Sequence, residues 1–351
     1  MFTADCKQGL HFFEKFQEIP TKDPTAVKFF SIDDDLFLVF GDFFGDNSGH
    51  KVVVYKMESK RFIVIQTLSP HGARAIEHFK IDGVHYMAIV KFYHERSVIY
   101  KWSTDKFEEF QVISIKFPSG LKFFTIDGDH YLAGSTSVYK WHRGRFVKYQ
   151  DIPSDGAEAC DSIVIANETF LVYPNHGLSL RKYNPESIVV TNAESSVYKW
   201  SGYHFVKFQS VKTPSTYSAK FFRVNGHVAL AFASYYTGSK HNTSSPIYKW
   251  DGVKFTLFQE VPTKGAIDMH PFVMNGEIFF AVANYRGNSG GYSVRSVVYK
   301  ASGAQFTLYQ DLQTFGARGV HAIVHKGQGY LVFANNQKKN FNTISFVYKF
   351  T

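Results

Sequence analysis

The chain has 351 residues, of which 44% are hydrophobic and 17% aromatic, and it carries a formal charge of +9. Its two cysteines, Cys6 and Cys160, exclude a small scaffold held by several disulfides. No apolar run reaches about 18 residues, so we expect no membrane insertion, and the first residues show no signal-peptide pattern. The positive charge favours acidic partners without identifying one.

Seven pairs of alternating segments are each joined by a short turn, and they predict β-hairpins. In a clear example, residues 75–81 and 85–90 alternate around Asp82-Gly83. Asp-Gly and Asn-Gly tolerate the positive φ that such turns require, so they are strong hairpin signals. In chain order the turns are Asp33-Asp34, Asp82-Gly83, Asp127-Gly128, Ala166-Asn167, Asn225-Gly226, Asn275-Gly276 and Lys326-Gly327.

A second repeated pair of strands follows each hairpin. A Tyr-Lys pair marks the third strand of a unit, at Tyr55, Tyr100, Tyr139, Tyr198, Tyr248, Tyr299 and Tyr348. A Phe and then a Gln mark the fourth strand, beginning with Phe62 and Gln66 and recurring at Phe107 and Gln111, Phe146 and Gln150, Phe205 and Gln209, Phe255 and Gln259, and Phe306 and Gln310. The spacing of these units is typical of propeller blades.

One unit is divided between the two ends of the chain. Tyr348 has no Phe and Gln after it, whereas Phe13 and Gln17 have no Tyr-Lys pair before them. A ring explains this division, because the N-terminal strand then completes the last blade; a linear solenoid would show polar capping repeats instead. We therefore predict an all-β fold, a single seven-bladed β-propeller of four-stranded antiparallel blades. The predicted blades are approximately 24–66, 73–113, 120–151, 157–211, 217–261, 266–312, and 317–351 closed by 10–19.

The repeated stretch resembles the epitempin repeat, also called the EAR or EPTP repeat. Residues 195–209 read SSVYKWSGYHFVKFQ, close to the repeat pattern, and registered copies cover essentially the whole chain. The repeat is known from leucine-rich glioma-inactivated proteins, but this chain has no leucine-rich repeats. The resemblance implies a seven-bladed propeller that is extracellular, binds other surface molecules and is not an enzyme.

The connections between the second and third strands, and between successive units, differ most among the repeats. Variable loops on one rim of a rigid scaffold are where binding sites are usually built. Aromatic rings beside polar donors suit both sugar rings and protein contacts, although these loops could instead pack on one another. The predicted ligand-binding residues are Phe43, Phe44, Phe92, Tyr93, His94, His176, Tyr183, Tyr235, Tyr236, Tyr285, Arg286, Asn335 and Lys338, and Tyr292 shares their pattern.

One column on the first strand of each unit is charged or His in every copy. The first strand is innermost in a propeller, so we expect this column to line the central channel. It consists of Lys28, Glu77, Lys122, Asp161, Lys220, His270 and His321. The first interpretation of this column is a hydrated channel whose charges compensate one another. The more specific interpretation is a binding site for an anion or a metal ion. The ligand spacing of a metal site is missing, so we predict no metal.

Two classes of function remain after the motifs are considered. No H-E-x-x-H motif or phosphate-binding glycine loop is present, and we predict neither an enzyme nor a cofactor. No nucleic-acid-binding module is recognised either. Our first expectation is a lectin that binds cell-surface glycans through the loop face and serves adhesion; the alternative is a secreted module that binds a receptor or other glycoprotein ectodomain. The motif tryptophans, such as Trp200 and Trp250, offer stacking platforms for sugars, but recurrence in every blade favours packing.

Overall fold

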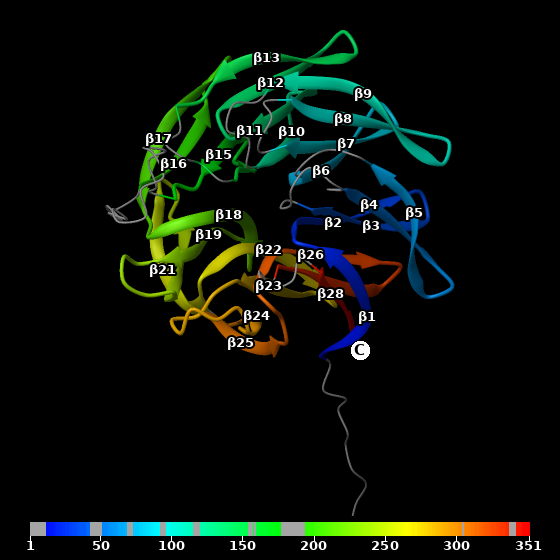
Figure 1. Ribbon diagram of the computed structural model, residues 1–351. Helices are drawn as coiled ribbons and strands as arrows, with labels where there is room; N and C mark the ends of the chain where they lie inside the picture. The colour runs from blue at the N-terminus through cyan, green and yellow to red at the C-terminus, as the bar shows by residue number, and fades with distance from the viewer. Residues whose placement is uncertain are drawn as a thin grey trace, which may run out of the picture.

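The computed structural model describes residues 12–42, 51–68, 73–91, 96–114, 120–153, 157, 159–176, 194–303, 305–336 and 342–351. These residues form seven four-stranded antiparallel sheets that stand around a ring like the blades of a propeller (Figure 1). The predicted all-β, seven-bladed fold is confirmed. The described part of the chain contains no helix with the length and apolarity needed to cross a bilayer.

The strands follow one another around the ring, four to a blade. Blade 1 contains β2 (Pro24–Ile32), β3 (Asp35–Asp42), β4 (Val52–Glu58) and β5 (Arg61–Leu68), and blade 2 contains β6 (Ala73–Ile81), β7 (Val84–Lys91), β8 (Arg96–Ser103) and β9 (Lys106–Ser114). Blade 3 contains β10 (Leu121–Ile126), β11 (Asp129–Gly134), β12 (Ser137–His142) and β13 (Arg145–Asp151), and blade 4 contains β14 (Asp161–Ile165), β15 (Glu168–Tyr173), β16 (Glu194–Trp200) and β17 (Phe205–Lys212). Blade 5 contains β18 (Ser215–Val224), β19 (His227–Tyr236), β20 (Asn242–Trp250) and β21 (Phe255–Lys264), and blade 6 contains β22 (Ala266–Met274), β23 (Glu277–Asn284), β24 (Ser296–Ser302) and β25 (Gln305–Leu312). Blade 7 contains β26 (Ala317–His325), β27 (Gln328–Asn335), β28 (Asn342–Phe350) and, from the other end of the chain, β1 (Phe13–Lys22).

Tight turns join the first two strands of the blades, as the sequence predicted. In blade 5 both turn residues have positive φ, 47° at Asn225 and 77° at Gly226. This conformation matches the right-handed twist of the paired strands, and it is the reason that Asn-Gly favours hairpins. Blade 4 forms the same turn with Ala166 at a φ of 47° and Asn167 at 65°.

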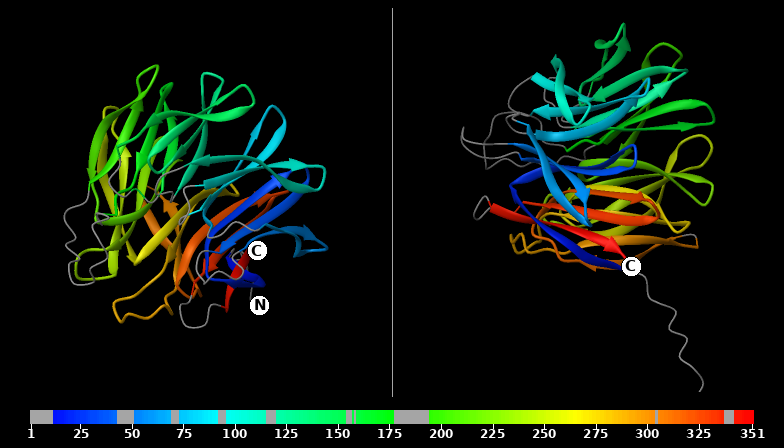
Figure 2. Two further views of the ribbon diagram at one scale, coloured as in Figure 1. Left: turned by 45° about the horizontal axis from the view of Figure 1, so that its top comes forward. Right: turned by 90° about the vertical axis from the view of Figure 1, so that its right-hand side faces the viewer.

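The N-terminal strand closes the ring. Strand β1 pairs antiparallel with β28, so that Phe13 lies opposite Phe350 and Lys22 lies opposite Asn342. Figure 2 shows the N-terminal strand beside the C-terminal one, with the end of the chain at the same edge of the molecule. The two ends of the sequence therefore make one blade, as the divided repeat predicted.

The Phe and Gln of the repeat join each blade to the next. In each outer strand, the Gln side chain accepts a hydrogen bond from the backbone N–H of a Phe in the following blade and donates one to the same residue's carbonyl. The seven pairs are Gln17 with Phe62, Gln66 with Phe107, Gln111 with Phe146, Gln150 with Phe205, Gln209 with Phe255, Gln259 with Phe306, and Gln310 with Phe13. These contacts form a closed ring of inter-blade clamps.

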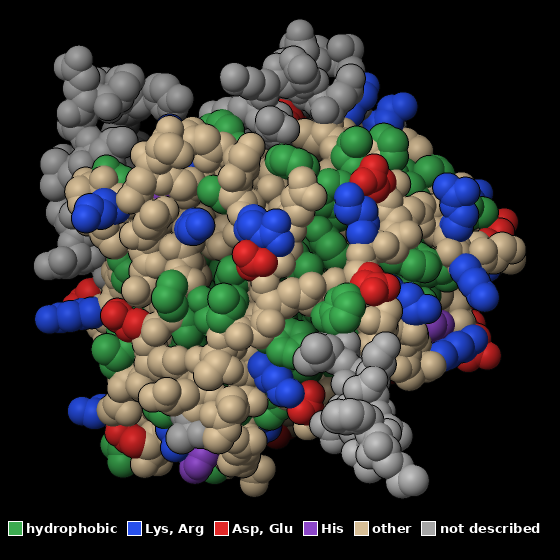
Figure 3. Space-filling model, turned by 90° about the horizontal axis from the view of Figure 1, so that it is seen from below, with side chains coloured by type: hydrophobic (Ala, Val, Ile, Leu, Met, Phe, Trp, Pro, Cys, Tyr) green, Lys and Arg blue, Asp and Glu red, His purple; other side chains and the backbone are tan. Residues whose placement is uncertain are grey.

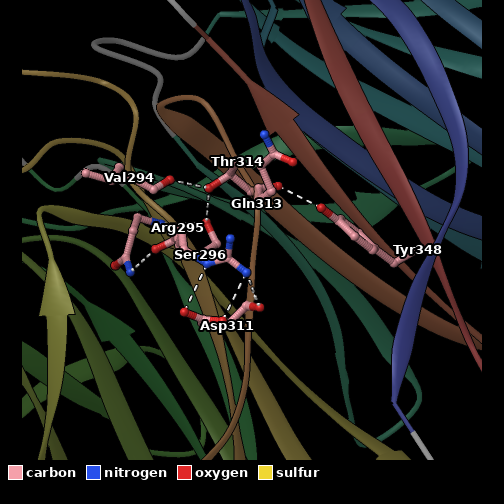
Figure 4. Close-up of polar contacts among 8 residues, drawn as sticks. Val294, Arg295, Ser296, Asp311, Gln313, Thr314 and Tyr348 are labelled. Atoms are coloured by element: carbon pink, nitrogen blue, oxygen red, sulfur yellow. Dashed lines mark hydrogen bonds and ion pairs between the residues drawn. The ribbon is translucent and has the colours of Figure 1, made fainter.

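The Ser and Tyr of the third strand hold the connection between blades. Between blades 6 and 7, Ser296 lies 2.9 Å from Thr314, whose hydroxyl also donates to the carbonyl of Val294 at 2.7 Å (Figure 4). The hydroxyl of Tyr348 donates to the carbonyl of Gln313 at 2.7 Å. Equivalent Ser–Thr contacts are Ser195 with Thr213, Ser245 with Thr263, and Ser345 with Thr21. The repeated motif is therefore largely a set of structural contacts.

The motif tryptophans belong to the hydrophobic core between blades. Trp200 lies edge-on to Phe205 of the same blade, with 5.1 Å between ring centroids, and packs at 5.7 Å against Tyr131 of the preceding blade. Trp250 makes the corresponding contacts with Phe255 and, in the preceding blade, with Phe170. The rings are thus engaged in packing, which favours the structural interpretation of the motif tryptophans.

Candidate functional site

The predicted loop-face residues are divided between described and undescribed parts of the chain. Seven of them lie outside the described residues: Phe43, Phe44, Phe92, Tyr93, His94, Tyr183 and Lys338. The remaining six are His176, Tyr235, Tyr236, Tyr285, Arg286 and Asn335. The geometry of the candidate site is therefore built from this second group and its neighbours.

Asn335 supports the fold from inside blade 7. It is fully buried, and its side-chain oxygen accepts a hydrogen bond from the N–H of Phe315 at 3.1 Å. Its side-chain nitrogen donates to the carbonyl of Ile344 at 2.8 Å. Asn284 makes the same pair of contacts in blade 6, with Lys264 and Arg295. The structure thus places Asn335 away from the surface that a ligand would meet.

The other five residues meet on one face of blades 4 to 6, together with four neighbours, one of which lies in blade 7. We call the whole group the loop-face cluster; its members are His176, Tyr217, Tyr235, Tyr236, His241, Tyr285, Arg286, Tyr292 and Arg318. Ring contacts run through it from blade to blade. The ring centroids of His176 and Tyr217 are 4.0 Å apart, those of Tyr217 and Tyr235 are 5.2 Å apart, and those of Tyr235 and Tyr285 are 6.4 Å apart.

Two arginines lie against the tyrosines of this cluster. The guanidinium of Arg318 lies 4.7 Å from the ring centroid of Tyr285, and that of Arg286 lies 5.8 Å from the ring centroid of Tyr292. The rings of Tyr285 and Tyr292 are in edge-on contact at 5.1 Å. Burial raises the pKa of the Tyr285 hydroxyl to about 12, against the lowering effect of Arg318, so this tyrosine stays neutral at physiological pH.

Part of the cluster is accessible from outside. Tyr285 and His176 are buried, whereas the side chains of Tyr235, Tyr236 and Arg286 are partly exposed. The rings of Tyr235 and Tyr236 lie 4.8 and 4.9 Å from that of His241. Burial lowers the pKa of His241, and the charge of Arg286 acts in the same direction, so the imidazole is neutral at pH 7. The exposed surface therefore combines tyrosine rings, a neutral imidazole and a guanidinium.

The central column predicted from the sequence lines a cavity of about 350 Å³ in the middle of the ring. All seven members border it. Ion pairs cross between adjacent blades: the ammonium of Lys28 lies 2.7 Å from Glu77, and that of Lys122 lies 2.8 Å from Asp161. The compensating charges expected for a hydrated channel are thus present for two of the three lysines.

The channel carboxylates also bind backbone amides. Asp161 accepts a hydrogen bond from the N–H of Phe221 at 2.9 Å, and Glu77 accepts one from the N–H of Phe123 at 3.4 Å. Burial raises the pKa of both carboxyls, but the neighbouring lysines outweigh it, with Lys122 acting on both, and the net pKa of each is lowered. Both groups are therefore charged and tie adjacent blades together.

His270 and His321 lie side by side in the channel, with 4.0 Å between their ring centroids. Burial and the channel lysines hold the pKa of both imidazoles well below the usual range. The Nδ1 of His321 lies 3.3 Å from the N–H of Phe29 and accepts its hydrogen bond. Among the described residues, no three His, Cys, Asp or Glu side chains are grouped so that they could hold a metal ion.

Sequence reasoning missed four residues that take part in these sites. Asp268 lies two positions before His270, where the other blades have the small residues Ala26, Ala75, Gly120, Ala159, Ser218 and Gly319. Its carboxylate accepts hydrogen bonds from Ser218 at 2.9 Å and from the N–H of Val320 at 3.1 Å. A carboxylate in a column of small residues was the available signal. The other three, Tyr217, His241 and Arg318, belong to the loop-face cluster.

Solved structures with a similar ring support the fold alone. The periplasmic gluconolactonase PpgL of Pseudomonas aeruginosa superposes with a TM-score of 0.60 at 12% identity, over 89% of this chain and 96% of the other. The N-terminal domain of Nup159 superposes with a TM-score of 0.52 at 11% identity, over 96% of this chain and 95% of the other. At identities this low, the function of these two proteins is not transferred to this chain.

Sequence relatives and a family model are more specific. The human thrombospondin-type laminin G domain and EAR repeat-containing protein is 33% identical over 110 residues, which are 31% of this chain and 15% of that protein. The mouse protein of the same name is 30% identical over 109 residues, again 15% of its length. This chain therefore matches a small part of each relative. The EPTP domain model matches residues 13–48, 61–103, 145–201, 204–251 and 254–300, well over half of the chain. The chain belongs to the EPTP domain family.

Proposed function

We propose that this chain is a non-enzymatic recognition propeller that binds a protein ectodomain outside the cell, through the exposed part of the loop-face cluster. Membership of the EPTP family suggests a protein–protein interaction module rather than an enzyme. Extracellular action is what the repeat resemblance implies. The gluconolactonase likeness is a likeness of fold and carries no activity to this chain.

The observation that carries the proposal is the composition of the cluster. Tyrosine and arginine are enriched among the residues that dominate protein interfaces, because they combine a large apolar area with directional hydrogen bonding. Here Tyr235, Tyr236 and Arg286 are partly exposed, and the buried Tyr285 packs against Tyr235. Ring packing fixes these side chains before a partner arrives, which lowers the entropic cost of binding.

On the side of the ring that Figure 3 shows, the described residues form no patch of one side-chain type. Seen from below the view of Figure 1, basic, acidic and hydrophobic side chains are interspersed on the surface (Figure 3). Exposed apolar residues on the outer strands, such as Val64 and Leu257, lie beside other exposed apolar residues, Ile63 and Phe258. Exposed apolar residues are common on protein surfaces and do not by themselves indicate a binding site.

Cell-surface carbohydrate, the first expectation from the sequence, is the second candidate. The partly exposed ring of Tyr236 beside His241 offers a stacking surface with a polar neighbour, the combination that binds sugars. The engagement of the motif tryptophans in the core weakens the idea of seven equivalent sugar sites. Among the described residues, this part of the loop face is therefore the place that we propose for a sugar.

Two arrays decide between the candidates. Purified protein is applied to an array of secreted and cell-surface ectodomains, and in parallel to a glycan array at low and physiological salt. The proposal predicts saturable binding to a small number of ectodomains that persists when their glycans are removed. Binding to one defined sugar that survives added salt would replace it with the carbohydrate function. If the protein binds only anionic glycans, and this binding disappears when salt is added, the interaction is a non-specific electrostatic attraction.

A further inference from the structure

The central cavity has an excess of positive charge. Among the described residues, five cationic side chains border it, namely Lys28, Arg74, Lys122, Lys220 and Arg318. Three carboxylates face them, those of Glu77, Asp161 and Asp268. The two histidines of the cavity are neutral, because their pKa values are held well below the usual range by burial. Among the described residues of the lining, cationic side chains therefore outnumber carboxylates by two.

One lysine of the central column lacks the carboxylate that the others have. Lys28 and Lys122 each pair with an acidic residue at the equivalent position of the next blade. For Lys220 the next blade supplies His270, which is neutral and cannot compensate an ammonium. Among the described residues Lys220 has neither an ion pair nor a hydrogen bond, although its charge acts on Asp161 and Asp268.

β-bulges direct further side chains towards the same cavity. In five blades the innermost strand carries one extra residue near its start, and each of these residues lines the cavity: Thr25, Arg74, Tyr217, Ile267 and Arg318. A bulge interrupts the alternation of a strand and turns a side chain to a new direction, and bulges are frequent next to functional sites. Two of the five bring a guanidinium to the end of the channel beside the loop-face cluster, to which Arg318 belongs.

From these features we infer that the channel holds one oxyanion group, a sulfate, phosphate or carboxylate, bound by the ammonium of Lys220 with Arg74 and Arg318 at the loop-face end. Guanidinium groups bind such groups with two parallel hydrogen bonds, and an ammonium adds a compact charge. The cavity of about 350 Å³ accommodates a group of this size with water around it. This inference is argued from the residues that line the channel, and it does not depend on the ectodomain partner proposed above.

The test measures small-anion binding and stability, without any macromolecular partner. Sodium sulfate, phosphate or acetate is titrated into the full chain by calorimetry, and the melting temperature Tm is followed, with sodium chloride at equal ionic strength as the reference. We expect saturable binding at one site and a Tm increase of about 2 °C or more near saturation. Lys220→Met should abolish both, while the exposed Lys254→Met should leave both unchanged.

The variants separate specific binding from general salt effects. Sulfate and phosphate stabilise proteins non-specifically at high concentration, and that effect is the same in Lys220→Met. If Lys220→Met fails to fold, Arg318→Gln, at the end of the channel, is expected to weaken binding at least tenfold. Finally, the affinity for a sulfated disaccharide is compared with the affinity for free sulfate. Tighter binding of the disaccharide identifies the ligand as an oxyanion group carried by a glycan. Equal or weaker binding of the disaccharide identifies the ligand as a free ion.

Two results would overturn the inference. The first is the absence of any saturable heat or Tm increase beyond that in sodium chloride. The second is an unchanged response in both channel variants, with both shown to be folded by circular dichroism. Neither result would bear on ectodomain binding, because these titrations contain no ectodomain.

Discussion

Gln310 binds both backbone groups of Phe13, a residue 297 positions earlier in the chain. Its side chain accepts from the Phe13 N–H at 2.8 Å and donates to the Phe13 carbonyl at 2.9 Å. The same two contacts occur at the other six blade interfaces, including that of Gln17 with Phe62. The junction between the two ends of the chain is therefore built like every other junction in the ring.

Removal of residues 1–22 is expected to abolish cooperative folding. The deletion removes β1, exposes the edge of β28 and leaves the apolar surface between blades 6 and 7 without Phe13. The measurement is thermal unfolding followed by circular dichroism, with a deletion of residues 1–11 as the matched control, which we expect to melt like the full chain. If the shorter chain lacking β1 melted at the same temperature as the full chain, closure of the ring by this strand would be wrong.

Gln310→Ala is expected to lower the free energy of unfolding by about 1–3 kcal/mol, because both backbone groups of Phe13 lose their partner. Urea unfolding measures the change. The exposed Gln305, in the same strand, is the control, and Gln305→Ala should stay within about 0.5 kcal/mol of the parent. Equal effects of the two substitutions would show that the clamp does not stabilise the junction.

The ring itself could be predicted from the sequence because its determinants are local and repeated. Asn225-Gly226 favours a hairpin because both residues adopt the positive φ that the turn requires. The recurring Phe and Gln occupy fixed positions in the outer strand. The divided repeat, with Tyr348 at one end and Phe13 at the other, showed that the ends must pair. The reason for the Gln could not be seen in the sequence, since its hydrogen bonds reach a different blade.

The candidate sites were predicted less completely, and the reason is physical. Arg74, Tyr217 and Arg318 each precede a residue of the channel column by three positions. Strict alternation would therefore place them on the opposite side of the strand from that column. Bulges in β6, β18 and β26 break that alternation and bring all three to the cavity. Bulges depend on contacts between neighbouring strands, which periodicity within one strand does not report. For the same reason the sequence did not distinguish the buried Asn335 from the partly exposed Tyr236.

A buried carboxyl in blade 1 makes stability depend on pH near neutrality. Burial raises the pKa of Asp42 to about 7, against hydrogen bonds from the backbone of Lys22 and Lys51 and the charge of Lys22, while the charge of Asp23 raises it further. Burial raises the pKa of the Tyr55 hydroxyl to about 12, and the charge of the Asp42 carboxylate acts in the same direction. The folded chain thus favours protonated Asp42. Its stabilising contribution is complete below the unfolded pKa of 3.8 and is lost as the pH rises through about 7.

The expected result is that the free energy of unfolding falls between about pH 4 and pH 7, by up to about 1.4 kcal/mol per pH unit from this group. Other carboxyls contribute their own slopes, so the difference between the parent and Asp42→Asn isolates this one. The variant keeps a neutral side chain and should lose that part of the pH dependence. Parallel curves for the two proteins in urea unfolding from pH 4.5 to 8 would contradict the assignment.

The loop-face cluster and the channel share two side chains. Tyr217 and Arg318 line the central cavity and also contact Tyr235 and Tyr285 in the cluster. A partner seated on the cluster would therefore lie at the end of the channel, beside its excess of positive charge. This arrangement makes the face of blades 4 to 7 the recognition surface in our account, and the face with the tight turns is left without such a role.

The most direct test compares matched substitutions on the two faces, with an ectodomain selected on the array as the probe. Tyr236→Ser and Arg286→Ala alter the loop-face cluster; Tyr203→Ser and Arg61→Ala alter exposed residues at the tight turns of the opposite face. Surface plasmon resonance gives each dissociation constant. We predict that the first two variants weaken binding at least tenfold, about 1.4 kcal/mol each, while the last two bind like the parent. Loss of binding in the tight-turn variants, with the cluster variants unchanged, would contradict the account.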